Sequence, residues 1–92
     1  MKSKVELKKV KKSLKKLPTH IVHKFQGWVD NVESSGIAET RKVKGYHDEP
    51  LKGNRKGQRS IRLNDAYRAI YTEAIDGTVN VITVEEVSKH DY

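Results

Sequence analysis

The chain has no cysteine among its 92 residues and few aromatic residues. Without cysteine it can form neither a disulfide nor a thiolate zinc site, and a cysteine nucleophile is excluded. Any catalytic chemistry must therefore come from histidine, carboxylate, arginine, lysine or tyrosine side chains.

Long apolar runs are also missing. No stretch approaches the roughly 18 apolar residues that span a bilayer, and no apolar signal-peptide core follows the first lysines. We therefore expect a cytoplasmic protein without a membrane partner. A single domain over residues 1–92 is expected, because a chain of this length cannot bury a second core.

Acidic residues are the scarcer charged group. The chain has 12 Asp and Glu against 19 Lys and Arg, which gives a formal net charge of +7. A strongly basic small domain points to a polyanionic partner, bound on the surface or in a shallow groove. Nucleic acid is the leading candidate, ahead of an anionic membrane surface or an acidic protein.

The N-terminal segment has a helical pattern. Residues 1–16 combine eight lysines with Val5, Val10 and Leu14, which recur near helical spacing. This arrangement predicts a first amphipathic helix with a cationic outer face, and Pro18 ends it.

A second helix is expected from Thr19, a good N-cap residue, to the breakers at 34–36. Its apolar residues share one helical face and form the predicted core stripe: Ile21, Val22, Phe25, Trp28, Val29 and Val32. The short link at Pro18 predicts that the two helices form an antiparallel pair, with Phe25 and Trp28 as the largest core side chains.

The C-terminal half changes to a strand pattern. Alternating apolar and polar residues predict strands over 58–64, 67–75 and 78–87. Turn residues separate them at 64–65 and at Asp76–Gly77, a strong hairpin signal. The sequence therefore predicts an α+β fold, with an N-terminal helix pair packed on a small antiparallel sheet.

The stretch "EPLKGNRKG" places Glu49 directly before a cationic loop that contains two glycines. Glycine permits close backbone approach, and cations suit phosphate groups. A solvated basic turn is the alternative interpretation of the loop alone. Five cations of this region are the candidate RNA-binding residues: Lys52, Arg55, Lys56, Arg59 and Arg62.

The chain finishes on "HDY". If the third strand runs antiparallel to the second, its end returns beside Arg68 and brings His90 and Tyr92 with it. Metal-free RNA cleavage needs a base for the ribose 2′-hydroxyl, a cation for the phosphate and an acid for the leaving 5′-oxygen. Glu49, Arg68 and His90 suit these roles in that order, and Tyr92 suits stacking on a base.

The segments "EPLKGNRKGQRSIRLNDAYRAIY" and "HDY" resemble the RelE, YoeB and HigB toxins of bacterial toxin–antitoxin systems, which are ribosome-dependent mRNA interferases. The resemblance covers roughly residues 46–92. It implies a RelE-like microbial RNase fold and a metal-independent endoribonuclease without a cofactor. The implied partners are mRNA and ribosomal RNA in the ribosomal A site, together with a cognate antitoxin.

By this resemblance Glu49 is the general base, Arg68 steadies the transition state, and His90 and Tyr92 are the C-terminal pair. YoeB-like chains have that pair adjacent, whereas Asp91 separates it here, and HigB-like chains carry a histidine where Glu49 stands. Asp91 and His47 are therefore alternative candidates for the base. Family members often begin with a strand, which "MKSKVEL" does not favour.

The sequence also contains one weaker constellation of residues, and it allows two other functions. His20 and His23 have the i, i+3 spacing of a metal-ligand pair, but no third ligand is evident, so hydrogen-bonded surface histidines are favoured. A non-catalytic RNA- or ribosome-binding module would need only the cations. A ParE-like gyrase-inhibiting toxin is the third hypothesis, and no sequence feature requires it.

Overall fold

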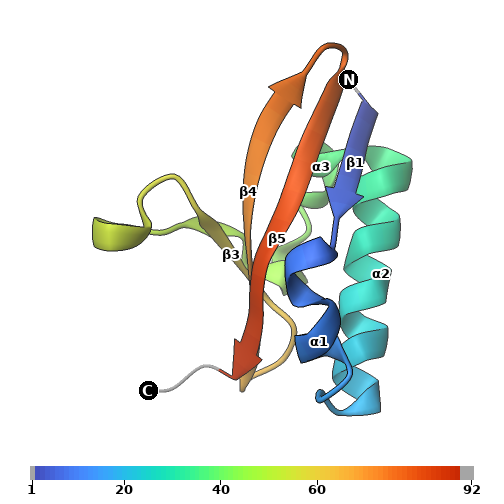
Figure 1. Cartoon of the computed structure of the whole chain (residues 1–92), viewed down its shortest axis with the longest axis vertical. Coiled ribbons are helices and arrows are strands. Elements are labelled where there is room, and N and C mark those ends of the chain that lie inside the picture. Colours follow the sequence, from blue (N-terminus) through green and yellow to red (C-terminus); the bar gives the residue numbers. More distant parts are fainter. Residues whose placement is uncertain (1, 90–92) are drawn as a thin grey trace.

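The computed structural model describes residues 2–89, in which helices pack on one side of a five-stranded sheet (Figure 1). This arrangement confirms the predicted α+β fold class. In chain order the elements are β1 (Lys2–Glu6), the 3-10 helix η1 (Lys8–Val10), α1 (Lys11–Leu14), α2 (Thr19–Ser35), α3 (Ile37–Thr40), η2 (Lys44–Tyr46), β2 (Glu49–Pro50), η3 (Gly53–Arg55), β3 (Arg59–Arg62), β4 (Tyr67–Asp76) and β5 (Val79–Lys89).

The sheet has the strand order β1-β5-β4-β3-β2. Strands β3, β4 and β5 form the predicted antiparallel meander, and their turns lie where the sequence placed them. The two-residue strand β2, which the sequence analysis did not predict, pairs antiparallel with β3. The tight β4–β5 hairpin turns at Gly77, whose φ of 62° favours a residue without a Cβ. Strand β1 pairs parallel with β5, so the complete sheet is mixed.

The helix predicted across residues 1–16 is wrong. Residues 2–6 form β1, and only Lys11–Leu14 is α-helical. The predicted apolar residues still reach the core: Val10 is buried, and Val5 and Leu14 pack against it. Local spacing misassigned the element because β1 takes its backbone partners from β5, a tertiary pairing that residues 1–16 do not encode.

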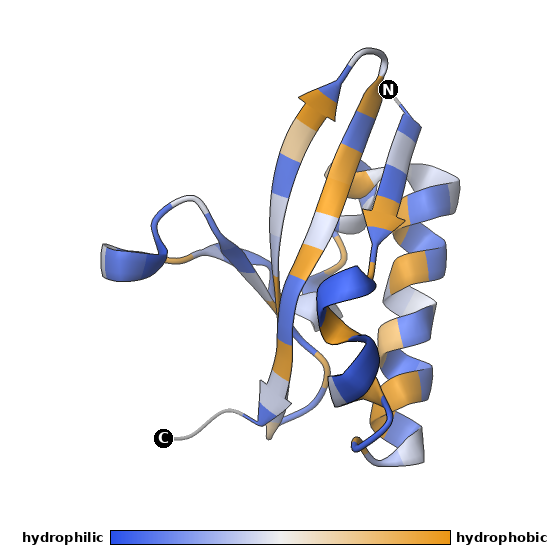
Figure 2. Cartoon of the chain, in the orientation of Figure 1, coloured by the Kyte–Doolittle hydropathy of each residue, from blue (hydrophilic) through white to orange (hydrophobic). Residues whose placement is uncertain are grey.

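Helix α2 covers the sheet with the predicted face. It ends before Gly36, whose φ of 88° stops the helix. Pro18 occupies the N-cap position that the sequence analysis gave to Thr19. Trp28 is fully buried, and its ring lies 5.9 Å from that of Phe25. Figure 2 shows apolar and polar residues alternating along α2 and β5, as expected for elements with one buried face.

Strand β1 also anchors the short helix α3. The Ser3 side chain is buried, and its Oγ accepts a hydrogen bond of 3.1 Å from the backbone N–H of Ile37. This N–H opens α3 and has no partner inside that helix. Ser3 therefore joins two elements that the sequence pattern did not connect.

Replacing Ser3 with alanine should lower the free energy of unfolding by about 1–3 kcal/mol, because it leaves the buried Ile37 N–H without an acceptor. Urea unfolding curves of the Ser3→Ala and wild-type proteins measure the difference. Ser34→Ala, at an exposed position of α2, is the matched control. Equal midpoints for the two variants would contradict the anchoring role of β1.

Candidate functional site

The face of the sheet opposite the helices carries a row of side chains from four strands. Glu49 of β2 pairs with Ser60 of β3, Ser60 pairs with Ile70 of β4, and Ile70 pairs with Glu86 of β5. Directly paired residues of antiparallel strands project to the same face. The row therefore places the carboxylates of Glu49 and Glu86 on one surface.

A second row lies two residues along the strands, on the same face. Arg62 of β3 pairs with Arg68 of β4, and Arg68 pairs with Ser88 of β5. A cleft of about 330 Å³ opens over this part of the sheet. It is lined by Leu51, Arg55, Ser60, Arg68, Ile70, Glu86, Ser88 and Lys89.

Arg68 is one of three cations that line this cleft, together with Arg55 and Lys89. Its side chain rises from a strand with neighbours on both sides, which holds it more firmly than a loop would. Within the described part of the chain, no carboxylate lies within ion-pair distance of it. Its guanidinium is therefore available to an anion in the cleft.

Two of the three candidate bases lie together at the edge of the same surface. The His47 Nε2 atom is 3.5 Å from Glu49 Oε2, and both side chains are about half exposed. His47 has a left-handed backbone, with φ at 46°. Both groups are open to solvent and to a substrate. Asp91, the third candidate, lies outside the described residues with His90 and Tyr92.

The five predicted RNA-binding cations divide between two environments. Lys52, Arg55 and Lys56 lie exposed on the loop before β3, which Figure 1 shows projecting away from the helices. Arg62 is exposed beside Arg68. Arg59 differs, because its partner across the sheet is Tyr71 on the helix side, and its Nε donates a 2.6 Å hydrogen bond to Asp48. The structure thus separates Arg59 from the other four.

Sequence reasoning missed Glu86, the carboxylate inside the cleft. Hydrogen bonds from Ser88 and Arg55 hold its pKa below the ordinary value, although partial burial opposes them. The group is therefore an anion at neutral pH. Strand alternation places Glu86 on the same face as Ser88, but its partner Arg55 is brought to it only by the fold.

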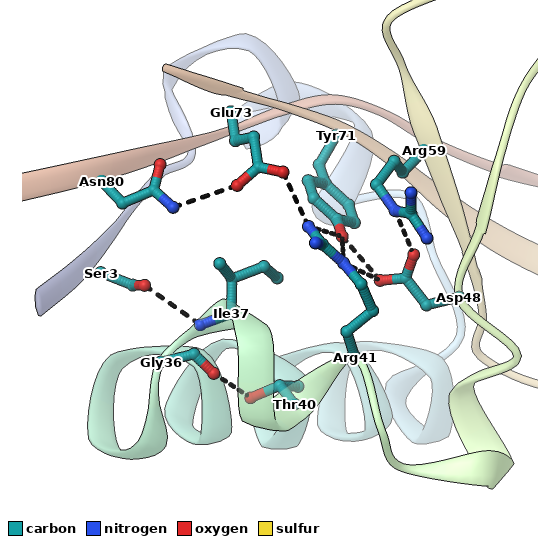
Figure 3. Close-up of polar contacts among 10 residues, drawn as sticks. All are labelled: Ser3, Gly36, Ile37, Thr40, Arg41, Asp48, Arg59, Tyr71, Glu73 and Asn80. Carbon is teal, nitrogen blue, oxygen red and sulfur yellow. Dashed lines mark hydrogen bonds and ion pairs between the residues drawn. The ribbon is translucent and has the colours of Figure 1, made fainter. Parts of the chain in front are cut away.

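A polar network behind the cleft fixes the segment that leads to Glu49 (Figure 3). The Asp48 side chain is completely buried, and it accepts hydrogen bonds of 2.6 Å from both Arg59 Nε and the Tyr71 hydroxyl. Arg41 donates to the Tyr71 oxygen over 3.2 Å and to Glu73 over 2.8 Å. Asp48 is thereby held on the helix side, so the next residue, Glu49, projects to the cleft side.

Burial and the bond to Asp48 raise the pKa of Tyr71 well above its ordinary value, although Arg41 opposes this shift. The phenol therefore stays protonated and keeps donating its hydrogen bond. In Glu73, burial is outweighed by hydrogen bonds from Asn80 and Arg41, which lower the pKa of the carboxyl. The Tyr71 phenol therefore keeps its proton, and Glu73 keeps its negative charge, at neutral pH.

Comparison with known proteins adds to this geometry. No family model and no curated sequence matches the chain. Among solved structures, it is similar to the YoeB/ParE toxin from Agrobacterium tumefaciens, at 22% identity and a TM-score of 0.69, over 99% of this chain and 100% of that one. It is also similar to YoeB in the YoeB–YefM complex from Staphylococcus aureus, at 20% identity and a TM-score of 0.64, over 100% of this chain and 98% of that one. A third similar structure is YafQ from E. coli, at 16% identity and a TM-score of 0.62, over 95% of this chain and 90% of YafQ. The chain has the RelE-like toxin fold.

The RelE-like fold predicted from residues 46–92 is thus confirmed over almost the full length of the chain. Strand β1, which "MKSKVEL" did not favour, is part of it. The match extends to the N-terminal half, where the sequence analysis recognised only helices. At these levels of identity the comparison establishes the fold, and the chemistry depends on the residues in the cleft.

Among residues 2–89 of this RelE-like fold, no group of three or more histidines and carboxylates is placed to hold a metal ion. His20 and His23 both lie exposed on α2. No helix in the same range is both long and apolar enough to cross a membrane.

The Tyr71 hydroxyl should stabilise the RelE-like fold through Asp48. Tyr71→Phe keeps the ring against Trp28 but removes a donor to a buried carboxylate, so the free energy of unfolding should fall by about 1–3 kcal/mol. Thermal or urea unfolding measures the loss. Tyr67→Phe, half-buried at the start of the same strand, should change it by about 0.5 kcal/mol or less. A Tyr71→Phe protein as stable as this control would show that the bond does not stabilise the fold.

Proposed function

We propose that this chain is a ribosome-dependent endoribonuclease toxin, an mRNA interferase, which cleaves translated mRNA and thereby inhibits translation. One observation carries the proposal: Arg68, a cation without a carboxylate partner among residues 2–89, lies in a cleft on the same sheet face as the candidate base Glu49. A protein that only binds RNA needs cations but has no use for a base at that place. The RelE-like fold agrees with this choice.

The proposed reaction needs no metal ion. Glu49 removes the proton of a ribose 2′-hydroxyl, and the 2′-oxygen attacks the adjacent phosphorus. Arg68 stabilises the negative charge that develops on the phosphate oxygens. The bond from phosphorus to the 5′-oxygen breaks, and His90 gives that oxygen its proton. His47 and Asp91 are the rival candidates for the base.

The remaining candidate residues act in binding. Lys52, Arg55, Lys56 and Arg62 contact the RNA backbone, and Tyr92 stacks on a base near the cleavage site. Arg59, the fifth predicted cation, is held by Asp48. The ribosomal A site supplies the positioning of mRNA that a small surface cleft cannot. This activity places the protein in the cytoplasm, with the whole chain acting as one toxin domain.

A cognate antitoxin neutralises the toxin in this proposal. The YoeB–YefM complex from Staphylococcus aureus, a toxin–antitoxin pair, supports such a partner for a chain of the same fold. The net charge of +7 favours an antitoxin segment that is acidic where it covers the cleft.

A second candidate function is inhibition of gyrase. One observation favours it: the similar structure from Agrobacterium tumefaciens is a YoeB/ParE toxin, and ParE-like toxins are the gyrase-inhibiting class named in the third hypothesis above. A gyrase inhibitor has no need of the cleft chemistry, so its action would survive loss of Arg68 or His90.

Expression of the protein in bacterial cells should cut translated mRNA, and His90→Ala should lower the cutting about 100- to 10,000-fold, because general acid catalysis contributes that much. Primer extension on a translated and an untranslated copy of one transcript detects the cuts. His20→Ala, on the exposed face of α2, is the control that should cut normally. Translation arrest with intact mRNA would favour a binding module, and intact mRNA with blocked replication would favour gyrase inhibition.

Substitutions of the paired residues Arg68 and Arg62 should distinguish an effect on the cleavage step from an effect on ribosome binding. Arg68→Ala should lower the cleavage rate on saturated ribosomes by about 100- to 1,000-fold while leaving ribosome affinity nearly unchanged, because its charge acts mainly as the phosphate reacts. Arg62→Ala, at the position opposite it on β3, should weaken affinity and leave the saturated rate intact. Single-turnover cleavage and ribosome pelleting measure the two quantities. The reverse pattern would exclude Arg68 from the chemical step.

A further inference from the structure

An ion pair crosses the cleft between the projecting loop and the sheet. Arg55 Nη2 lies 2.9 Å from Glu86 Oε1, and Arg55 Nη1 donates a 3.1 Å hydrogen bond to Gln58. The Arg55 and Glu86 side chains are 46% and 40% exposed. The pair therefore lies at the mouth of the cleft, where a ligand from solvent can reach both groups.

The second oxygen of the same carboxylate is also engaged. Ser88 Oγ donates to Glu86 Oε2 over 2.7 Å. One guanidinium and one hydroxyl, from separate elements, thus bind the two oxygens of one anion, and Arg68 lines the same cleft. Guanidinium and hydroxyl donors converging on paired oxygens are the arrangement that binds phosphate groups in proteins.

We propose that the Glu86 carboxylate occupies a phosphate-binding site, and that an incoming phosphate takes over its hydrogen bonds from Arg55 and Ser88. The ligand class is a phosphate mono- or diester. The inference rests on the proposed function only in naming RNA as the source of that phosphate. From the sequence, Arg55 is one of five candidate RNA-binding cations. In the structure, its ion pair with Glu86 makes it one of the two donors of a defined anion site.

Phosphate can exchange for the carboxylate because both members of the ion pair are exposed. A solvent-accessible ion pair contributes little net stability, so an anion can displace the carboxylate without unfolding the loop. A phosphate offers more acceptor oxygens than a carboxylate and can also engage Arg68. Glu86 remains nearby as a negative charge, so it lowers the affinity of the cleft for any anion that makes fewer contacts.

A different role for Glu86 predicts the opposite effect. If the carboxylate only holds Arg55 in place for binding, its removal should release the arginine and weaken phosphate binding. If the carboxylate occupies the site, its removal should strengthen binding. The sign of the change therefore decides between the two roles.

Titration of the full chain with inorganic phosphate, followed by amide chemical shifts of residues 51–62 and 86–88, is the test. Glu86→Gln should bind phosphate about three- to tenfold more tightly than wild type, because the competing charge is gone. Glu85→Gln is the matched control: it removes an equal charge at the neighbouring position, where the carboxylate pairs with Lys9 and does not line the cleft. This control should change the affinity less than twofold, about the effect of a screened surface charge.

A double substitution tests whether the gain in phosphate affinity depends on Arg55. In an Arg55→Ala background, Glu86→Gln should gain much less, because the donor for which carboxylate and phosphate compete is missing. Weaker or unchanged binding by Glu86→Gln, or a gain no larger than that of Glu85→Gln, would overturn the proposal. Absence of phosphate binding in all variants would overturn it as well. The titration uses neither RNA nor ribosomes, so its result is independent of whether the protein cuts mRNA.

Discussion

The antiparallel pairing of β4 with β5 is the constraint on which the other features depend. Each strand contributes one set of side chains to the helix side, including Tyr71 and Val84, and the alternate set to the open side, including Arg68 and Ser88. Burial of the first set under α2 fixes the direction of the second. The position of the cleft is therefore a consequence of how the core packs, and a register slip of one residue would exchange the two faces.

Tyr71 connects these two sides most directly. Its ring centroid lies 5.4 Å from that of Trp28 in the core, and its hydroxyl binds the carboxylate of Asp48. Asp48 in turn precedes Glu49, which faces the cleft. The edge strand β2 has only two residues and little packing of its own, so this buried carboxylate gives it a fixed place on the sheet. The Tyr71 side chain thus links the apolar core to the edge strand β2.

Much of this organisation could be predicted from periodicity, because α2 and the strands β3 to β5 have local patterns that match their buried faces. Strand β1 could not, because its partner β5 is distant in the sequence. In the site, the loop cations and Arg68 could be predicted from the sequence, because a cationic motif lies beside a predicted strand. Arg59 and Glu86 required the structure, because their partners, Asp48 and Arg55, are brought to them only by the fold. A charge in a sequence does not show whether it faces water or another charge.

The parallel pairing of β1 with β5 also has a consequence for folding. It joins Lys2 to Val79, so the contact spans nearly the whole described length of the chain. Such a long loop is closed late and slowly, because its entropy must be lost before the pairing can stabilise it. While the ribosome synthesises the chain, β1 has no partner strand until β5 has emerged. The strand that completes the sheet also carries Glu86 and Ser88 of the cleft, so a nascent chain passes most of its synthesis without the finished surface.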